Sequence, residues 1–263
     1  MYNLKVDTHV HTIYSKHAFS TVAENVAHAT RKGLSAIAIT DHFGLLLPWF
    51  DNKREYECEN HIKSARLPNA AYGVRVFNGI EIDIIGLDGQ LAGYEIDCKG
   101  YMGYDRFLDY LLESKELVIA SVHYFDGMKD GSIAENTRMY TNVLSKPKVA
   151  ILGHPNRVEL EFDFKEVVAA AKTYNKIIEI NAETISSRPH LKNRCLKIAQ
   201  ECAEQGVMVC VGSDAHVCYN VGEFEPALAL LSEIDFPPNL IVNRSLETFE
   251  AALIKARGLN EQI

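Results

Sequence analysis

The chain lacks an excess of positive charge. It has 27 lysines and arginines against 35 aspartates and glutamates, which gives a formal net charge of −8. A general nucleic-acid-binding protein needs a basic stripe that neutralises phosphates, so this balance argues against that class. It does not exclude a small anionic substrate, because bound cations dominate the electrostatic field of a local site.

Long apolar segments and paired cysteines are also missing. No stretch approaches about eighteen consecutive apolar residues, the length typical of a membrane-spanning helix. The six cysteines include no C-x-x-C pair, so we expect free thiols. Residues 1–7 lack the basic and apolar stretches of a signal peptide, which predicts a cytoplasmic location. No linker or internal repeat interrupts the sequence, so we predict a single domain over residues 1–263.

What the sequence does contain is a series of short β-branched apolar runs, separated by longer segments of helical periodicity. This alternation is typical of repeated βα units and predicts a parallel sheet. A weaker eighth run lies at residues 240–243. The seven clear runs are residues 4–7, 36–40, 74–78, 117–122, 149–152, 177–180 and 207–211. So many units favour a closed α/β barrel over an open, doubly wound sheet.

The segments between the runs predict helices and one hairpin. The clearest helices are expected over residues 21–32, 164–174 and 191–205. Thr21 can cap the first of them and Gly33 can end it. Residues 83–97, with an Asp-Gly pair near the middle, indicate a β-hairpin.

Nearly every apolar run ends within a few residues of a side chain that can bind a metal ion. In a barrel of parallel strands these run ends converge on one rim, where such enzymes place their active sites. We therefore expect residues far apart in sequence to meet there. In chain order they are His9, His11, His17, Asp41, His42, Glu81, His123, His154, Asn181, Asp214 and His216.

A single histidine at a strand end is more often a hydrogen-bonded structural residue than a ligand. Seven of them beside carboxylates would leave many buried polar groups without partners, whereas metal binding satisfies them together. His9 and His11 lie two residues apart, on the same face of an extended strand, so they can chelate one ion. Asp214 and His216 share this spacing, although a turn between them can direct them to different ions.

The sequence says less about the roles of three other histidines and two arginines. His28, His61 and His190 lie away from the run ends, and we expect them to be ordinary surface residues. Arg157 and Arg188 follow the fifth and sixth runs, where a guanidinium can bind phosphate oxygens through two hydrogen bonds. An arginine in such a loop is as often merely solvated, so both interpretations stay open.

The chain carries a set of motifs that resembles the PHP superfamily, named for polymerase and histidinol phosphatase domains. These motifs are H-V-H, S-K-H-A-F-S-T, I-T-D-H, G-I-E, S-V-H, G-H-P and G-S-D-A-H. The resemblance covers residues 6–243. Within that range, K-H-A-F-S-T, E-I-N, G-E-F-E and D-F-P-P are most similar to the YcdX-like phosphatase branch.

The resemblance implies a distorted seven-stranded (β/α)7 barrel of the TIM type, with three divalent metal ions at the carboxyl ends of the strands. Zinc is the typical metal, and manganese or iron are alternatives. Matched by motif, the ligands of the first ion are His9, His11, Glu81 and Asp214. Those of the second are the bridging Glu81, His123 and His154. Those of the third are His17, His42 and His216.

A nitrogen-rich ligand set favours Zn²⁺, Mn²⁺ or Fe²⁺ over Mg²⁺. The resemblance further implies a phosphoric monoester hydrolase, in which a hydroxide activated by the trinuclear site would attack a small phosphorylated substrate and release inorganic phosphate. Glu81 and Asp214 are the expected catalytic carboxylates, with Arg157 and Arg188 as candidates for binding phosphate. The alternatives are a phosphodiesterase or exonuclease, a histidinol phosphatase, and a non-catalytic metal-binding module, against which the complete ligand set argues. Neither a membrane nor a nucleic acid is an expected partner.

Overall fold

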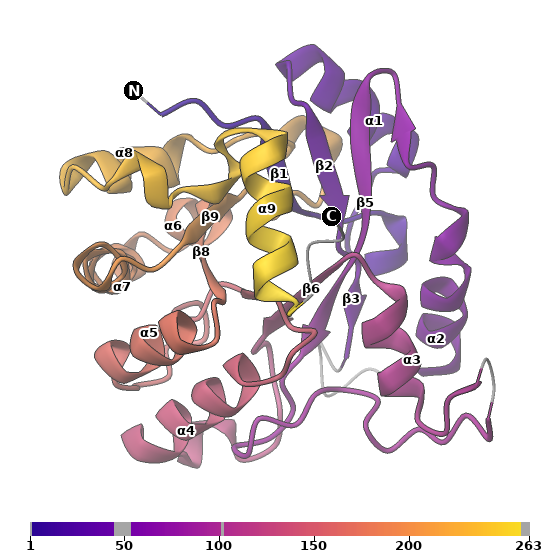
Figure 1. Ribbon diagram of the computed structural model, residues 1–263, viewed down its shortest axis with the longest axis horizontal. Helices are drawn as coiled ribbons and strands as arrows, with labels where there is room; N and C mark the ends of the chain where they lie inside the picture. The colour runs from indigo at the N-terminus through magenta and orange to yellow at the C-terminus, as the bar shows by residue number, and fades with distance from the viewer. Residues whose placement is uncertain (1, 45–53, 101–102, 259–263) are drawn as a thin grey trace.

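The computed structural model describes residues 2–44, 54–100 and 103–258. Seven parallel strands pair in the order β1, β2, β5, β6, β7, β8 and β9, and the short strands β3 and β4 pair with β5. They form a nearly closed barrel with helices between them (Figure 1), which confirms the predicted (β/α)7 barrel. The strands are β1 Val6–Val10, β2 Ala36–Ile39, β3 His42–Phe43, β4 Ala70–Ala71, β5 Val74–Asp83, β6 Leu117–Ser121, β7 Ile151–Leu152, β8 Ile177–Asn181 and β9 Val209–Gly212.

The helices follow the predicted signals where these were clearest. α1 begins after Thr21, whose hydroxyl accepts from the N–H of Glu24 while the Glu24 carboxylate accepts from the N–H of Thr21. It ends at Gly33, whose φ of 68° suits a residue without a Cβ atom. α5 and α7 begin and end within one residue of the predicted bounds. The helices are α1 Val22–Lys32, α2 Arg54–Lys63, α3 Phe107–Ser114, α4 Ile133–Leu144, α5 Phe164–Thr173, α6 Ala182–Ser187, α7 Lys192–Gln205, α8 Glu225–Glu233 and α9 Leu246–Ala256.

Three segments differ from the prediction. β5 extends to Asp83, five residues beyond the predicted run, so Glu81 lies inside the strand. The eighth run is not a strand: it forms 3-10 turns at Pro238–Leu240 and Val242–Arg244, with a single bridge to β9. Residues 83–97 contain a hairpin shorter than predicted: Ile84 bridges Leu91 in the antiparallel sense, Ile85 N–H donates to the carbonyl oxygen of Gln90 at 2.8 Å, and Ala92 N–H donates to that of Asp83 at 2.9 Å.

No regular ladder joins β9 to β1 in the described chain. A parallel bridge between Val10 and Ala215 and a set of side-chain hydrogen bonds join them, and we call this junction the β1–β9 seam. The buried amide of Asn243 donates to the carbonyl oxygens of Val6 (2.8 Å) and Val211 (2.9 Å). Its oxygen accepts from the N–H of Val211 at 3.1 Å. A side chain of the eighth run therefore substitutes for missing ladder hydrogen bonds.

Asp7 strengthens the same seam. Its buried carboxylate accepts from the N–H of Ser213 (3.1 Å), the hydroxyl of Ser213 (2.5 Å) and the N–H of Gly222 (2.8 Å). Burial raises the pKa of Asp7 to about 6, and these donors oppose the rise. Asp7 thus fixes the loop that follows β9 against β1.

Helix α9 packs against side chains that fill the barrel interior. Phe249 of α9 meets Phe77 of β5 edge-on, with ring centroids 5.4 Å apart, in a cluster that also includes side chains from the other long strands. The Nζ of Lys176, just before β8, donates to the carbonyl oxygen of Ala256 at the end of α9. The end of α9 therefore lies at the amino ends of the strands, and the carboxyl ends of the strands form the opposite rim.

None of the helices in the described part of the chain is long and apolar enough to cross a membrane. The longest of them, α7, has 14 residues.

The expectation that His61 is a surface residue is wrong. Its side chain in α2 is only 6% exposed, and Nε2 donates to the carbonyl oxygen of His42 at 3.1 Å. The buried ammonium of Lys115 donates in turn to the carbonyl oxygen of His61 (3.0 Å), to Asn78 Oδ1 (3.2 Å) and to the hydroxyl of Ser64. This network fixes α2 against the barrel beside the strand that carries His42.

Lys115 makes the stability of the fold depend on pH. Burial lowers the pKa of its ammonium from 10.5 to about 7, and the carboxylate of Asp41 offsets part of that effect. Between pH 7 and about 8.5 the unfolded chain keeps this proton while the folded chain releases it, so raising the pH favours the folded state. Urea unfolding should show that the free energy of unfolding rises over this interval by about 2 kcal/mol more than in Lys115→Met.

Other titratable groups contribute equally to the pH dependence of the wild type and of Lys115→Met, so their effects cancel in the comparison. Lys176, whose pKa burial lowers to about 8, is present in both proteins. Buried thiols such as Cys202, whose pKa burial raises, lower the stability above about pH 8.5, and they too are present in both proteins. Identical pH dependence in the two proteins would show that Lys115 remains charged in the folded state.

Candidate metal centre

Glu81 lies near the carboxyl end of β5 and is completely buried. It pairs directly with His42 of β3 in the sheet register. Its Oε2 atom is 2.7 Å from His42 Nδ1, 3.3 Å from His9 Nε2 and 3.5 Å from His11 Nε2. One carboxylate oxygen therefore faces three imidazole nitrogens that come from two other strands or their ends.

The second oxygen of Glu81 faces the histidines that follow β6 and β7. Oε1 is 2.7 Å from His154 Nε2 and 3.5 Å from His123 Nε2. His154 adopts a φ of 23°, a value that non-glycine residues rarely adopt and that is often retained at functional sites. Glu81 thus lies between two groups of imidazoles, as a carboxylate that bridges two cations would.

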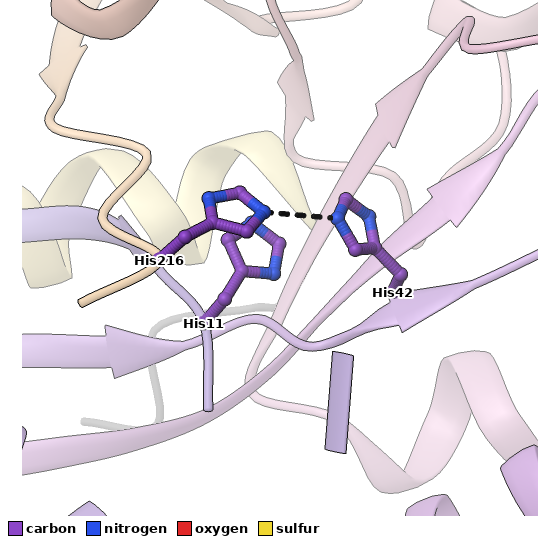
Figure 2. Close-up of side chains that lie close together, drawn as sticks. All are labelled: His11, His42 and His216. Carbon is purple, nitrogen blue, oxygen red and sulfur yellow. Dashed lines mark hydrogen bonds between the residues drawn. The ribbon is translucent and has the colours of Figure 1, made fainter. Parts of the chain in front are cut away.

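Asp214 and His216 reach the cluster from the loop after β9. Asp214 Oδ1 is 3.1 Å from His11 Nε2 and 3.7 Å from His9 Nε2. His216 places Nδ1 2.9 Å from the carbonyl oxygen of Asp214, and its Nε2 lies 3.4 Å from His42 Nε2. Figure 2 shows the rings of His11, His42 and His216 gathered around one point. The turn between Asp214 and His216, where Asp214 has a φ of 56°, directs the two side chains differently.

The histidine rings around Glu81 and Asp214 favour the ionised form of both carboxylates. Burial by itself would raise the pKa of Glu81, but the neighbouring rings of His9 and His123 lower it well below the usual range. Burial likewise opposes ionisation of Asp214, and His9, followed by His11 and Arg157, lowers its pKa well below normal. Both carboxylates are therefore ionised and available to bind cations at neutral pH.

Several buried atoms of the cluster lie close to one another, yet they make no hydrogen bond of acceptable geometry among the described residues. They are His9 Nε2, His11 Nε2, His42 Nδ1, Glu81 Oε2 and Asp214 Oδ1. An unpaired buried polar atom costs about 1–3 kcal/mol, so a cation among them supplies a common cause for their arrangement. Imidazole and carboxylate groups are ligands that zinc, manganese and iron accept.

The side chains fit divalent ions in more than one place. Four overlapping groups of three have potential ligand atoms within 4.8 Å of one another. These groups are His11, His42 and His216; His9, His154 and Asp214; His9, His11 and Glu81; and His42, Glu81 and His123.

His17 lies at the edge of the cluster and belongs to none of these groups. Its exposed ring stacks at centroid distances of 4.5 Å from His216 and 5.1 Å from His42. Of the histidines expected on the surface, His190 is exposed and His28 is half-buried. His17 is therefore close to the cluster, and its role as a ligand stays a prediction.

Glu179 orients two of the histidines, and sequence reasoning does not identify it. Its Oε1 atom is 2.7 Å from His9 Nδ1, and its Oε2 atom accepts from the backbone N–H of His154 at 2.9 Å. A carboxylate behind an imidazole fixes the ring so that the other nitrogen points at a metal. The available signal is an ionisable residue in the middle of a buried run, I-I-E-I-N.

Two further rings are held in the same way. Asp83 Oδ1 is 2.7 Å from His123 Nδ1. The hydroxyl of Ser15 is 3.0 Å from His11 Nδ1 and donates to Asp41 Oδ1 at 2.6 Å. In each case Nε2 is left to face the centre of the cluster. Asp83 lies on β5 and His123 follows β6, so sequence spacing does not reveal this pair, whereas Ser15 follows His11 by four residues and the strand-end position of Asp41 already suggests such a role.

The two arginines have different surroundings. Arg157 Nη1 bonds to Glu183 and lies 3.4 Å from Asp214 Oδ2, at the edge of the cluster. Although burial lowers the pKa of its guanidinium, the carboxylates of Asp214 and Glu183 raise it, so Arg157 stays charged. Arg188 follows α6, and within the described ranges its side chain forms no hydrogen bond or ion pair. The structure therefore brings only Arg157, of these two, against the cluster.

Known proteins share both the sequence pattern and the barrel. A match to the PHP domain family covers residues 7–185, well over half of the chain. The chain belongs to the PHP family. A probable phosphatase of Caldanaerobacter subterraneus subsp. tengcongensis is 36% identical to this PHP chain, over 97% of it and 92% of the relative. A probable phosphatase of Acetivibrio thermocellus is 36% identical over 93% of each chain.

Among solved structures, this PHP chain is similar to histidinol phosphate phosphatase from Lactococcus lactis subsp. lactis. That crystal structure contains zinc, L-histidinol and phosphate. The TM-score is 0.57 at 19% identity, over 89% of this chain and 94% of the other. At this identity the similarity shows that the fold is shared.

Proposed function

We propose that this PHP-family chain is a phosphatase that uses divalent metal ions to hydrolyse a small phosphomonoester. The observation that carries the proposal is the group of buried ligand atoms without hydrogen-bond partners around Glu81. Relatives over almost the whole chain are named probable phosphatases. The L. lactis enzyme with the same fold holds zinc and phosphate.

We assign the side chains to three ions, with zinc as the favoured metal and manganese or iron as alternatives. The first ion would be held by His9, His11, Glu81 and Asp214. The second would be held by Glu81, His123 and His154. The third would be held by His17, His42 and His216. The close approach of ligand atoms in the groups around Glu81 and His42 supports this division.

When bound in such a cluster, divalent ions neutralise a phosphate dianion and supply a hydroxide nucleophile at neutral pH. Glu81 would bridge two of the ligand groups, while Glu179 and Asp83 keep His9 and His123 in their orientations. Arg157 would bind the non-bridging oxygens of the phosphate. Arg188 remains a candidate for binding phosphate because of its position in the sequence, and no described contact of its side chain supports that role.

The purified protein is expected to hydrolyse phosphomonoesters faster than phosphodiesters. A suitable panel contains p-nitrophenyl phosphate, nucleotides, sugar phosphates, histidinol phosphate and bis(p-nitrophenyl) phosphate. In His9→Ala, kcat/KM should fall by about a hundredfold or more, because His9 Nε2 faces both Glu81 and Asp214. Elemental analysis of protein purified without added metal should find at least about two transition-metal equivalents per chain.

Other outcomes of this panel separate the alternatives. Faster turnover of the diester would indicate a phosphodiesterase or exonuclease, and a strong preference for histidinol phosphate would indicate a histidinol phosphatase. A protein that retains metal without any turnover would be a non-catalytic module. Monoester turnover that survives His9→Ala would show that the reaction takes place elsewhere.

A further inference from the structure

Glu183 lies beside Arg157 at the edge of the metal centre. It belongs to the first turn of α6 and is 33% exposed. Its Oε2 atom accepts a hydrogen bond from Arg157 Nη1. The same nitrogen is 3.4 Å from Thr184 Oγ1 and 3.4 Å from Asp214 Oδ2. Three acceptors therefore converge on one corner of the guanidinium.

The other edge of the Arg157 guanidinium is available. A guanidinium carries five N–H donors in one plane, and two adjacent donors match two oxygens of a phosphate. In the part of the chain that the structure describes, every hydrogen bond of the Arg157 side chain involves Nη1. Neither Nη2 nor Nε is among the buried atoms without a partner, so both can reach solvent or a ligand.

The element that carries Glu183 is itself fixed to the cluster. Asn181 caps α6 by accepting from the N–H of Thr184 at 2.8 Å. Its amide nitrogen also donates to Asp214 Oδ2 at 3.3 Å. The carboxylate of Asp214 thus contacts both the cap of α6 and Arg157, so the first turn of the helix is held at a defined distance from the metal centre.

We propose that Glu183 is a positioning residue, which holds the Arg157 guanidinium by one corner so that its other edge binds the phosphate group of the substrate. This inference rests on the proposed phosphatase function. Arginine has a long side chain with many rotamers, and a ligand that must order it binds more weakly than one that meets it already ordered. Without Glu183, the guanidinium keeps only the two longer contacts, to Thr184 and Asp214.

The test uses the metal-loaded protein and two measurements. In Glu183→Ala, the KM for p-nitrophenyl phosphate and the Kd of inorganic phosphate, measured by calorimetry, should both rise about tenfold. The kcat should change much less, because the interaction is present in both the bound substrate and the transition state. Glu183→Gln, which keeps an acceptor oxygen but loses the charge, should recover part of the affinity.

A double-variant cycle shows whether Glu183 acts through Arg157. In an Arg157→Ala background, Glu183→Ala should have no further effect on the Kd of phosphate. Glu161→Ala is the matched control, because Glu161 forms the same kind of pair with Arg194 and has no part in the cluster. Neither KM nor Kd should change in that control.

Three results would overturn the proposal: an unchanged Kd in Glu183→Ala, an equal loss of affinity in the Arg157→Ala background, or a loss of bound metal in Glu183→Ala. The last would make Glu183 a support of the metal ligands. If the wild-type protein hydrolyses no phosphomonoester, the proposed function fails, while the phosphate Kd still tests the link between Glu183 and Arg157.

Discussion

Replacing Glu81 by glutamine is expected to lower kcat/KM for phosphomonoesters by about a thousandfold and to remove bound metal. The two oxygens of Glu81 each lie 2.7 Å from an imidazole nitrogen, of His42 and of His154 respectively. Glutamine keeps the shape of the side chain but presents an NH₂ group in place of one oxygen and has no charge. It therefore cannot bridge two cations. Steady-state kinetics and elemental analysis on the same preparation measure both effects.

Glu116→Gln is the matched control for this substitution. Glu116 precedes β6 at the opposite end of the barrel, is 40% exposed and pairs with Arg75. Its activity should stay within about twofold of wild type, as expected for an exposed ion pair. A Glu81→Gln protein with full metal content and activity within tenfold of wild type would show that Glu81 does not bridge the ions.

The second large effect concerns the β1–β9 seam. Asn243→Ala is expected to lower the free energy of unfolding by about 3 kcal/mol, measured by urea unfolding. The substitution removes three hydrogen bonds of the buried amide, and the main-chain groups of Val6 and Val211 lose their partners. Each buried group left without a partner costs more than a hydrogen bond contributes on average.

Asn142→Ala is the control for the Asn243 substitution. The Asn142 amide on α4 makes one exposed hydrogen bond, to the carbonyl oxygen of Asp88 at 3.0 Å. The same chemical change there should alter stability by less than about 1 kcal/mol, because water replaces the lost contact. Equal losses in the two variants would mean that the hydrogen bonds of the seam contribute little.

The barrel could be predicted from the sequence because its strands are buried on both faces. Such strands appear as continuous apolar runs, so the run at residues 177–180 identifies β8 without any alignment. The weak run at residues 240–243 fails for a local reason: Pro237 and Pro238 precede it. Proline has no N–H group to donate to a ladder, and its fixed φ suits the start of a 3-10 turn.

The cluster on the rim could be anticipated because parallel strands bring the residues after them to the same end. That reasoning brings together His9, His154 and Asp214 although they are far apart in the chain. It does not identify groups that meet only when the barrel closes. Glu179 lies behind His9 because the β1–β9 seam places β1 and β8 on either side of β9.

Burial of His61 and the position of Glu183 could not be derived from the sequence either. His61 lies in a polar segment, and it is buried because α2 is held down by the Lys115 network. Glu183 lies on a helix after β8, where a glutamate is ordinarily solvated. Its role depends on a hydrogen bond from Arg157, whose side chain reaches it from a different loop.

The order of synthesis has a consequence at the β1–β9 seam. Among the strands of the barrel, β1 is synthesised first and β9 last, yet His11 follows one and Asp214 follows the other, with only 3.1 Å between their ligand atoms. During translation His11 is therefore made some two hundred residues before Asp214, the carboxylate that it faces in the folded barrel. An ion that joins His11 to Asp214 would link the first and the last strands of the barrel, and it could be bound by both only after Asp214 has been synthesised.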